Sequence, residues 1–359
     1  MVSGAKYCWS VVPVRRKCGA LLIPLFVLVA FTYFLGQSYF PFLRMIKLRE
    51  KLNNRFVSDL YRLQPQVVIL QTYLNITTTV SVTPKNGTDD SEAFRNSHIM
   101  ISTGNGRLGN KMFEFASLLG IAKRHNYKPM ILRRNSLLQT FDISQVTDRQ
   151  PVNLKGLGER GAGVYDVSME TLSHDKNYSL GGFYQSWKYF DFMSQEVRNT
   201  FKFKSSFRDK AQQALTSLNI GRNLTIGVHV RRGDMNSKRE LSRGYNVATR
   251  EYFVKAFKYF RDKFKHLLFL VVSDDLNWCR SNIKDSDVRF VATGSAGSDL
   301  AFLSQCNHSV ISTGSFGWWG AYLTGGEVVY YRNFPANNSW LIKQYNRTEY
   351  YPLRWIGME

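Results

Sequence analysis

From residue 225 onward, short apolar runs alternate with helical patterns, and this order constrains the fold more than any other feature. The runs have the length of buried strands, and the segments between them carry apolar residues at helical spacing. Strands are predicted at 226–230, 267–272, 288–291, 309–312 and 328–331, with the clearest helices at 249–265 and 316–323. Alternation of this kind predicts a parallel sheet covered by helices on both faces, a Rossmann-like unit.

The first of these strands ends in a cluster of charged residues. His229 lies within the run, and Arg231, Arg232 and Asp234 follow it directly. Open α/β sheets bind ligands at the carboxyl ends of their strands, and two guanidiniums can hold a pyrophosphate in bidentate fashion. A surface basic pair beside a core histidine is the plain alternative, and the stretch by itself does not decide between the two.

An earlier strand and helix, at 99–124, enclose a glycine-rich turn. Apolar residues fall on one face of the helix, so the turn presents backbone N–H groups at a helix N-terminus, where a phosphate or sugar nucleotide fits. The spacing of Gly104, Gly106 and Gly109 satisfies a dinucleotide-type pattern. That pattern is weak evidence, because a tight strand-to-helix turn has it too and no acidic residue follows about twenty positions on.

Two later strands also end in polar turns. Ser273 and Asp274 follow the run at 267–272, and a Ser/Thr/Gly turn leads from the run at 309–312 into Ser315 and Phe316. Hydroxyls and amides at such a turn suit a phosphate. Phe316 or Trp318 would border a base or a sugar, whereas core packing is the better reading for Trp319.

Taken together, these blocks resemble the α-1,2-fucosyltransferases of glycosyltransferase family 11. Residues 229–234 match the family's basic motif, His-x-Arg-Arg-x-Asp. Residues 106–110 match its glycine-rich motif, with Arg107 where we expect a second glycine. Further blocks follow in the family's order at 182–190, 273–279 and 315–323, and the resemblance covers about residues 98–335.

The resemblance implies the glycosyltransferase B architecture, in which two Rossmann-like units face each other across a cleft. It also implies inverting transfer of L-fucose from GDP-β-L-fucose to the 2-hydroxyl of a terminal galactose on a glycoprotein or glycolipid. In that scheme the arginines stabilise the charge that grows on the pyrophosphate, so no metal or other cofactor is expected. His229, Asp234 and Asp274 are the candidates for a general base, and the sequence does not rank them.

The expected site therefore has two parts. As the catalytic group we nominate His229, Arg231, Arg232 and Asp234. For donor binding we nominate Gly104, Asn105, Gly106, Arg107, Gly109, Asn110, Ser273, Asp274, Ser315, Phe316 and Trp318.

An uncharged apolar stretch at residues 19–35 predicts a membrane anchor. Basic residues at 15–17 precede it, which favours a cytosolic N-terminus, although basic residues beyond the span weaken that argument. A cleaved signal peptide is the alternative, but no small-residue cleavage pattern follows. We expect a single-pass type II Golgi protein with these parts: cytoplasmic tail 1–18, signal anchor 19–40, stem 41–97, N-terminal catalytic unit 98–220 and GDP-fucose-binding unit 221–359.

Sequons and cysteines agree with a lumenal body. Seven Asn-x-Ser/Thr sequons follow the apolar stretch, and we expect glycosylation at Asn75, Asn86, Asn177, Asn337 and Asn346. Asn223 and Asn307 adjoin predicted strands and fit chance matches better. Cys279 and Cys306 are candidates for one disulfide in an oxidising compartment, and their spacing does not suit a metal site.

Charge and short motifs also allow other functions. The net charge of +21 suits an anionic donor or a nucleic acid, but a lumenal location removes nucleic acid from reach. Asp285 and Asp287 have the form of a manganese motif, yet they lie in a polar turn. The remaining alternatives are a Golgi sulfotransferase, suggested by residues 84–88, and a membrane-anchored lectin on a transferase-like fold. A homodimer is compatible with any of these classes.

Overall fold

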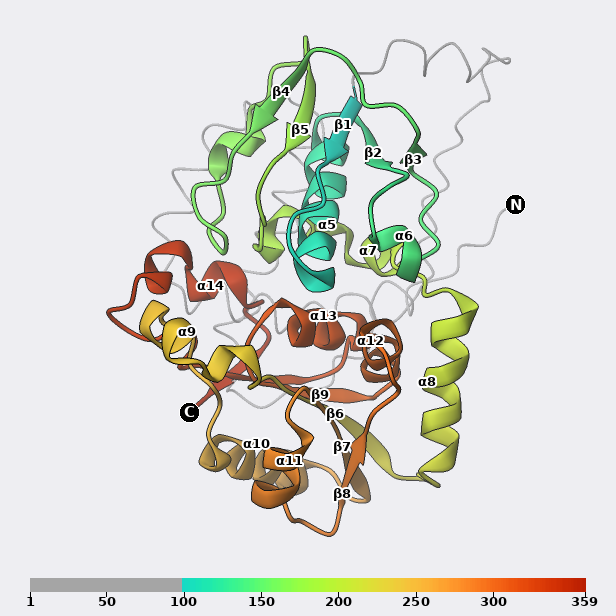
Figure 1. The fold of residues 1–359 in the computed structure, drawn as a ribbon, viewed down its shortest axis with the longest axis vertical. Helices are drawn as coiled ribbons and strands as arrows, with labels where there is room; N and C mark the ends of the chain where they lie inside the picture. Colours follow the sequence, from blue (N-terminus) through green and yellow to red (C-terminus); the bar gives the residue numbers. More distant parts are fainter. Residues whose placement is uncertain (1–98) are drawn as a thin grey trace, which may run out of the picture. The chain divides into compact units, whose positions relative to one another are not determined.

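The computed structural model describes residues 99–359, and the strands in this range form two parallel sheets (Figure 1). The first sheet has the order β3-β2-β1-β5-β4, and the second has the order β11-β10-β9-β6-β7-β8. The first contains β1 Ile99–Ser102, β2 Lys128–Leu132, β3 Val146–Thr147, β4 Leu154–Leu157 and β5 Asn177–Leu180. The second contains β6 Leu224–Val230, β7 Leu267–Ser273, β8 Val288–Val291, β9 His308–Ile311, β10 Val328–Tyr331 and β11 Ile356–Met358.

Helices connect most of the strands, as parallel pairing requires. The α-helices are α5 Leu108–Arg124, α6 Leu137–Thr140, α7 Ser194–Thr200, α8 Ser205–Ser217, α9 Lys238–Arg243, α10 Arg250–Lys263, α11 Leu276–Asn282, α12 Ala296–Ser304, α13 Ser315–Thr324 and α14 Arg347–Tyr350. Short 3-10 helices cover Val167–Glu170, Trp187–Tyr189, Asp191–Met193, Asp234–Asn236 and Leu341–Gln344.

The predicted α/β fold with parallel sheets is confirmed. The five strands predicted after residue 225 are β6 to β10, and the helix expected at 249–265 is α10. Strand β11 was not predicted, because three residues at 356–358 are too few to show a period.

Strand β7 shows why these runs are apolar throughout. Leu268, Leu270 and Val272 pack in a cluster with residues of α8 and α12, whereas Phe269 and Val271 pack in the cluster that contains α10. Successive side chains of a strand point to opposite faces. Both faces of the second sheet are therefore covered at β7, which explains why this strand needs no polar face.

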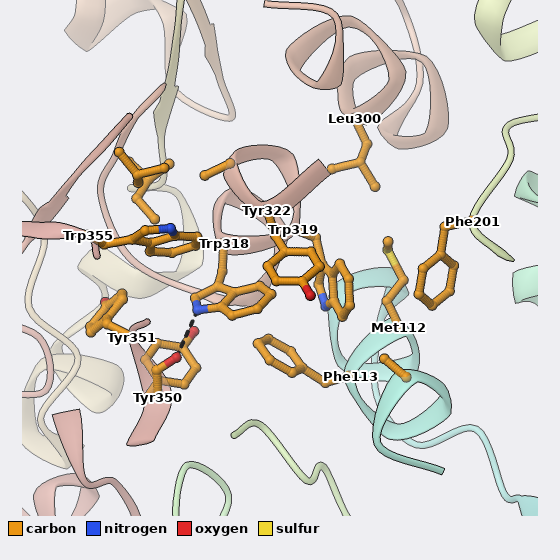
Figure 2. Packing of buried hydrophobic residues seen from close by; sticks show 14 of the residues in the cluster. Met112, Phe113, Phe201, Leu300, Trp318, Trp319, Tyr322, Tyr350, Tyr351 and Trp355 are labelled. Atoms are coloured by element: carbon orange, nitrogen blue, oxygen red, sulfur yellow. Dashed lines mark hydrogen bonds between the residues drawn. The ribbon is translucent and has the colours of Figure 1, made fainter. Parts of the chain in front are cut away.

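Aromatic side chains fill the region between α5 and α13 (Figure 2). The ring of Phe113 on α5 lies 4.4 Å from that of Trp318 and 5.2 Å from that of Trp319, both on α13. The Trp318 indole also donates a hydrogen bond of 2.9 Å to the carbonyl of Tyr350. This shared core joins the two sheets, and residues 99–359 belong to one compact unit.

Replacement of Gly120 should measure how tightly α5 is packed. A Cβ at this helix position would lie 2.0 Å from the backbone oxygen of Tyr189. We expect Gly120→Ala to lower the free energy of unfolding by about 1–3 kcal/mol because of this clash. Without the clash the substitution would stabilise the protein, since alanine favours a helix more than glycine does. Urea unfolding measures the change. Gly156→Ala is the matched control, since nothing lies within 4 Å of a Cβ at Gly156. Equal stability of the two variants would contradict the prediction.

Several predictions fall on residues outside the described range. These are the cytoplasmic tail, the anchor at 19–40, the stem at 41–97 and the sequons at Asn75 and Asn86. Among residues 99–359, no helix combines the length and the apolar character needed to cross a membrane. The division of the body near residue 220 stays a prediction.

Candidate active site

A cavity of about 920 Å³ lies at the carboxyl ends of β6 to β9, and the turn between β1 and α5 also lines it. Parallel strands end at one edge of their sheet, so polar turns that are far apart in sequence meet there. The cavity is lined by eleven of the predicted site residues: Gly106, Arg107, Gly109, Asn110, His229, Arg231, Asp234, Ser273, Asp274, Ser315 and Phe316.

Arg231 is the central cation of this cavity. Its Nη2 lies 2.6 Å from Asp234 Oδ1, and its Nη1 lies 3.1 Å from Asp274 Oδ2. Its backbone N–H donates to Ser312 Oγ at 2.7 Å. A guanidinium has five N–H donors, so the two carboxylates fix its plane and leave donors for a ligand. Arg231 is thus oriented before an anion arrives.

Arg232 does not line the cavity, which corrects the expectation that both arginines face one ligand. Its guanidinium carbon lies 3.9 Å from the ring centre of Trp278, and its Nη1 donates to the carbonyl of Ala248 at 3.2 Å. Burial lowers its pKa, an effect that the nearby charge of Asp275 opposes. The two adjacent arginines therefore have different partners: Arg231 contacts Asp234 and Asp274 at the cavity, whereas Arg232 packs on Trp278 of α11.

Two helix N-termini converge at the cavity, those of α5 and α13. Neither carries a side-chain cap. They meet at Gly109, where a Cβ would lie 2.7 Å from the carbonyl carbon of Ser315 and 2.8 Å from the nitrogen of Phe316. Free N–H groups and the helix dipole make such ends favourable for an anion. Glycine at position 109 allows the two ends to approach this closely.

Asn110 links three of the sequence blocks. Its Oδ1 accepts hydrogen bonds from Ser315 Oγ and from Gln185 Nε2, the latter at 2.9 Å. Gln185 Oε1 in turn accepts from the Tyr345 hydroxyl at 2.7 Å. Gln185 was not nominated as a site residue, although it lies in the block at 182–190. Its side-chain amide bonds with Asn110 and Tyr345, which are far away in sequence, so the local sequence pattern could not predict its position.

Glu114 is a buried carboxylate that the sequence analysis missed. It accepts hydrogen bonds from the backbone N–H groups of Thr103 (2.6 Å), Gly104 (3.0 Å) and Asn105 (2.7 Å). The hydroxyl of Ser102 also donates to it at 3.0 Å. Gly104 and Asn105 are not among the residues that line the cavity, and their donor contacts stay a prediction. Their backbone amides bind Glu114. Glu114 could have been found from the sequence, because it is an acidic residue within an apolar stretch of the helix, six positions after Leu108.

The three candidates for a general base have different surroundings. Asp234 contacts Arg231 and also Arg107, whose Nη1 lies 3.3 Å from its Oδ2. Asp274 contacts Arg231 and accepts the N–H of Arg232 at 2.8 Å. His229 is buried against α13, with its ring centre 5.2 Å from that of Phe316, and its Nδ1 has no hydrogen-bond partner. Both aspartates thus brace arginines, and His229 is held as a neutral ring.

Acid should destabilise the fold through His229. Burial, with a smaller effect from the charge of Arg231, lowers the pKa of His229 from 6.5 to about 3. Between these values the unfolded chain binds a proton that the folded chain does not, so stability falls as the pH drops below 6.5 and is unaffected above it. At pH 5 the loss should be roughly 2 kcal/mol relative to pH 7.

Urea unfolding at pH 7 and pH 5 measures this difference. His229→Gln should lose less stability on acidification than the wild-type chain. His266→Gln, which removes an exposed histidine, should lose as much as the wild type. If both variants respond to acid alike, His229 is not the residue responsible.

Two more nominations need correction. Trp318 is fully buried in the core between α5 and α13 and does not border the cavity, whereas Phe316 does. Cys279 and Cys306 are free thiols, so the expected disulfide is not present. They belong to different clusters of the hydrophobic core. Burial raises the pKa of Cys279 to about 11 and that of Cys306 to about 12.

Other residues line the cavity without having been predicted. The turn after β8 contributes one wall, and the segment around α9 contributes another. They include Ser237, Arg239, Glu240, Tyr245, Gly294, Ser295, Ala296, Asp299 and Thr313. The turn after β8 could have been found from the sequence, because it follows a predicted strand just as the other site turns do.

The sequons of the described range differ in exposure. Asn337 and Asn346 are exposed, and Asn177 is half-buried on β5. Asn307 is exposed, but its Oδ1 accepts the N–H of Thr225 at 2.9 Å. Asn223 Nδ2, the atom that a glycan would modify, donates to the carbonyl of Ile220 at 2.7 Å. Within residues 99–359, no cluster of three or more His, Cys, Asp or Glu side chains has an arrangement that could hold a metal ion.

Comparison with known proteins identifies close relatives of the chain. The family model described as glycosyl transferase family 11 matches residues 67–359. Galactoside alpha-(1,2)-fucosyltransferase 1 of Rattus norvegicus is 34% identical over 271 residues, which cover 71% of this chain and 72% of the relative. The protein of the same name from Bos taurus is 33% identical over 267 residues, covering 70% and 74%. Among solved structures, NodZ alpha-1,6-fucosyltransferase co-crystallized with GDP has a TM-score of 0.47 and 16% identity, covering 66% of this chain and 96% of that one.

Proposed function

The chain belongs to glycosyl transferase family 11, and from this premise we propose that it is a galactoside α-1,2-fucosyltransferase. It transfers L-fucose from GDP-β-L-fucose to the 2-hydroxyl of a terminal galactose and inverts the anomeric centre. The names of the relatives support the activity, and the region that the family model matches, residues 67–359, includes the whole cavity. Galactose-terminated glycans of glycoproteins or glycolipids are the acceptors.

The observation that carries the donor site is the meeting of two uncapped helix N-termini beside Arg231. Breakage of the bond between fucose and GDP leaves negative charge on the pyrophosphate. Fixed N–H groups and a guanidinium stabilise such charge most when they are already in position. Arg231 meets this requirement, because Asp234 and Asp274 hold its plane.

The positive groups at this site take the part that a divalent cation plays in other transferases. We therefore expect transfer to continue in the presence of a chelator, with no metal or other cofactor needed. The proton of the acceptor hydroxyl passes to a base that we leave unassigned among His229, Asp234 and Asp274.

The architecture and location complete the proposal. The two parallel sheets, with a cavity lined from both, support a glycosyltransferase B arrangement. The apolar stretch at 19–35 and the sequons that follow it support a type II anchor with the body in the Golgi lumen. A homodimer is compatible with this topology.

Donor turnover tests the function. The detergent-solubilised full chain is offered GDP-fucose, other sugar nucleotides or a phosphosulfate donor, with a β-galactoside acceptor and with or without EDTA. Chelator-resistant transfer from GDP-fucose alone is the expected result. Sulfate transfer would indicate a sulfotransferase, and glycan binding without turnover of any donor would indicate a lectin on a transferase-like fold.

A further inference from the structure

The segment that contains α9 forms part of the cavity wall. Ser237 and Glu240 line the cavity, as does Tyr245 just after the helix. Trp340 does not line the cavity itself and is 53% exposed. A tryptophan with half of its surface in water is unusual for a side chain that is on average highly buried. An exposed aromatic ring next to the cavity is available to contact a ligand.

Arg243 connects Trp340 to the cavity wall. Its guanidinium carbon lies 5.2 Å from the ring centre of Trp340 and 5.8 Å from that of Tyr245. Its Nη1 donates to both oxygens of Glu240, at 3.2 and 3.1 Å. The side chain of Glu240 is only 20% exposed. One arginine thus supports both aromatic rings and orients a carboxylate at the wall.

The chain around Trp340 is fixed to the end of α9. Gly244 has a φ of +108° and ends the helix in the left-handed region, and a Cβ there would lie 2.1 Å from Ser339 Oγ. The N–H of Ala336 donates to the carbonyl of Gly244 at 2.9 Å. Glycine is needed at position 244 because other residues rarely adopt this backbone conformation and because a side chain would collide with Ser339. The Trp340 ring is therefore carried by a braced segment next to the cavity.

We propose that Trp340, Tyr245 and Glu240 form the subsite that binds the acceptor glycan. A galactoside presents C–H groups on one face of each ring and hydroxyls at its edge. An exposed indole suits the first, and a fixed carboxylate accepts hydrogen bonds from the second. The position also fits the reaction, since Glu240 and Tyr245 line the cavity that contains Arg231, and Arg243 joins both of them to Trp340. This inference rests on the proposed function and extends it to the acceptor.

Kinetics of the full chain with methyl β-D-galactoside as the acceptor test this subsite. We expect Trp340→Ala to raise the acceptor KM by roughly threefold to tenfold, and to raise it by more than the KM for GDP-fucose. Trp340→Phe should recover most of the loss, because an aromatic ring remains.

Phe192→Ala provides the matched control. Phe192 is also an exposed aromatic, at 54%, and it also has an arginine over its ring, Arg124 at 4.5 Å. Arg124 is the last residue of the 17-residue α5, whereas the cavity lies at the first turn of that helix, roughly 25 Å away. Phe192→Ala should leave both KM values as in the wild type.

Two kinetic results would overturn the inference. One is an acceptor KM that is unchanged in Trp340→Ala or that rises no more than the KM for GDP-fucose. The other is an effect of Trp340→Ala that disappears in an Asn337→Gln background, because Trp340 would then cover the chain's own glycan. If the wild-type chain transfers no fucose, the proposed function fails, and saturation-transfer NMR with methyl β-D-galactoside tests the subsite separately. A signal that Trp340→Ala abolishes and Phe192→Ala retains supports the subsite, and equal signals refute it.

Discussion

Arg231→Ala is expected to lower kcat/KM for fucosyl transfer by about 10³-fold, the largest effect on activity of any single substitution considered. Arg231 contacts both Asp234 and Asp274, so its removal takes away the central cation and leaves two carboxylates facing the pyrophosphate. Repulsion then adds to the lost attraction. The fold should persist, since the side chain lies at the cavity and is 22% exposed.

Initial rates with GDP-fucose measure this loss, and calorimetric titration with GDP measures the weakened binding that should accompany it. Arg231→Lys should recover only part of the activity, because an ammonium cannot hold two carboxylates in a fixed plane and still offer a fork of donors. Arg149→Ala, at an exposed position, is the control for removal of a positive charge. An Arg231→Ala enzyme with more than about a tenth of wild-type activity would remove Arg231 from the proposed role.

Arg232→Ala should give a different result from that of its neighbour. Loss of the stack on Trp278 and of the bond to the Ala248 carbonyl acts on the packing between β6 and α11. The main effect is therefore on stability. Urea unfolding and initial rates of the two variants measure this contrast between a residue at the cavity and a residue packed on α11.

Glu114→Ala is expected to cause the largest loss of stability, about 2–4 kcal/mol. The carboxylate accepts the N–H groups of three consecutive residues, 103–105, and is itself fully buried. Without it the glycine-rich turn has no fixed position relative to α5. Because the same turn leads into the cavity at Gly106 and Gly109, the KM for GDP-fucose should rise as well.

Thermal unfolding should show a fall in Tm of roughly 5–10 °C for Glu114→Ala. Glu114→Gln tests whether both carboxylate oxygens are needed as acceptors. We expect this variant to recover little of the lost stability, because the amide nitrogen of glutamine would face backbone N–H groups and cannot accept from them. Glu251→Gln is the control, because Glu251 is exposed on the first turn of α10. A wild-type Tm in Glu114→Ala would mean that water replaces the carboxylate at no cost, and the anchoring role would be wrong.

Most of the second sheet could be predicted because each of its strands has a local signature. The runs that became β6, β7 and β9 are rich in β-branched and other apolar residues, are buried at most positions, and end at polar or glycine-containing turns. The first sheet was harder to predict. Its strands are short, and β3 and β4 carry half-buried or exposed residues at most positions, so no period marks them.

The sequence by itself determined which chemistry is present and at which edge of a sheet it gathers. An arginine pair, a glycine-rich turn and a hydroxyl-rich turn each follow a predicted strand, and parallel strands bring such turns together whatever the details of packing. Side-chain direction was decided by the tertiary structure alone. Arg231 faces the cavity while Arg232 stacks on Trp278, a residue 46 positions away, and Phe316 lines the cavity while Trp318 fills the core.

The physical reason is the range of the interactions involved. Strand and helix periods are local, so a few residues suffice to reveal them. The direction of one side chain depends on partners supplied by distant elements. Gly109 against Ser315, Asn110 against Gln185 and Arg243 under Trp340 are contacts that no local pattern contains. They exist only once α5, α9 and α13 have packed around the cavity.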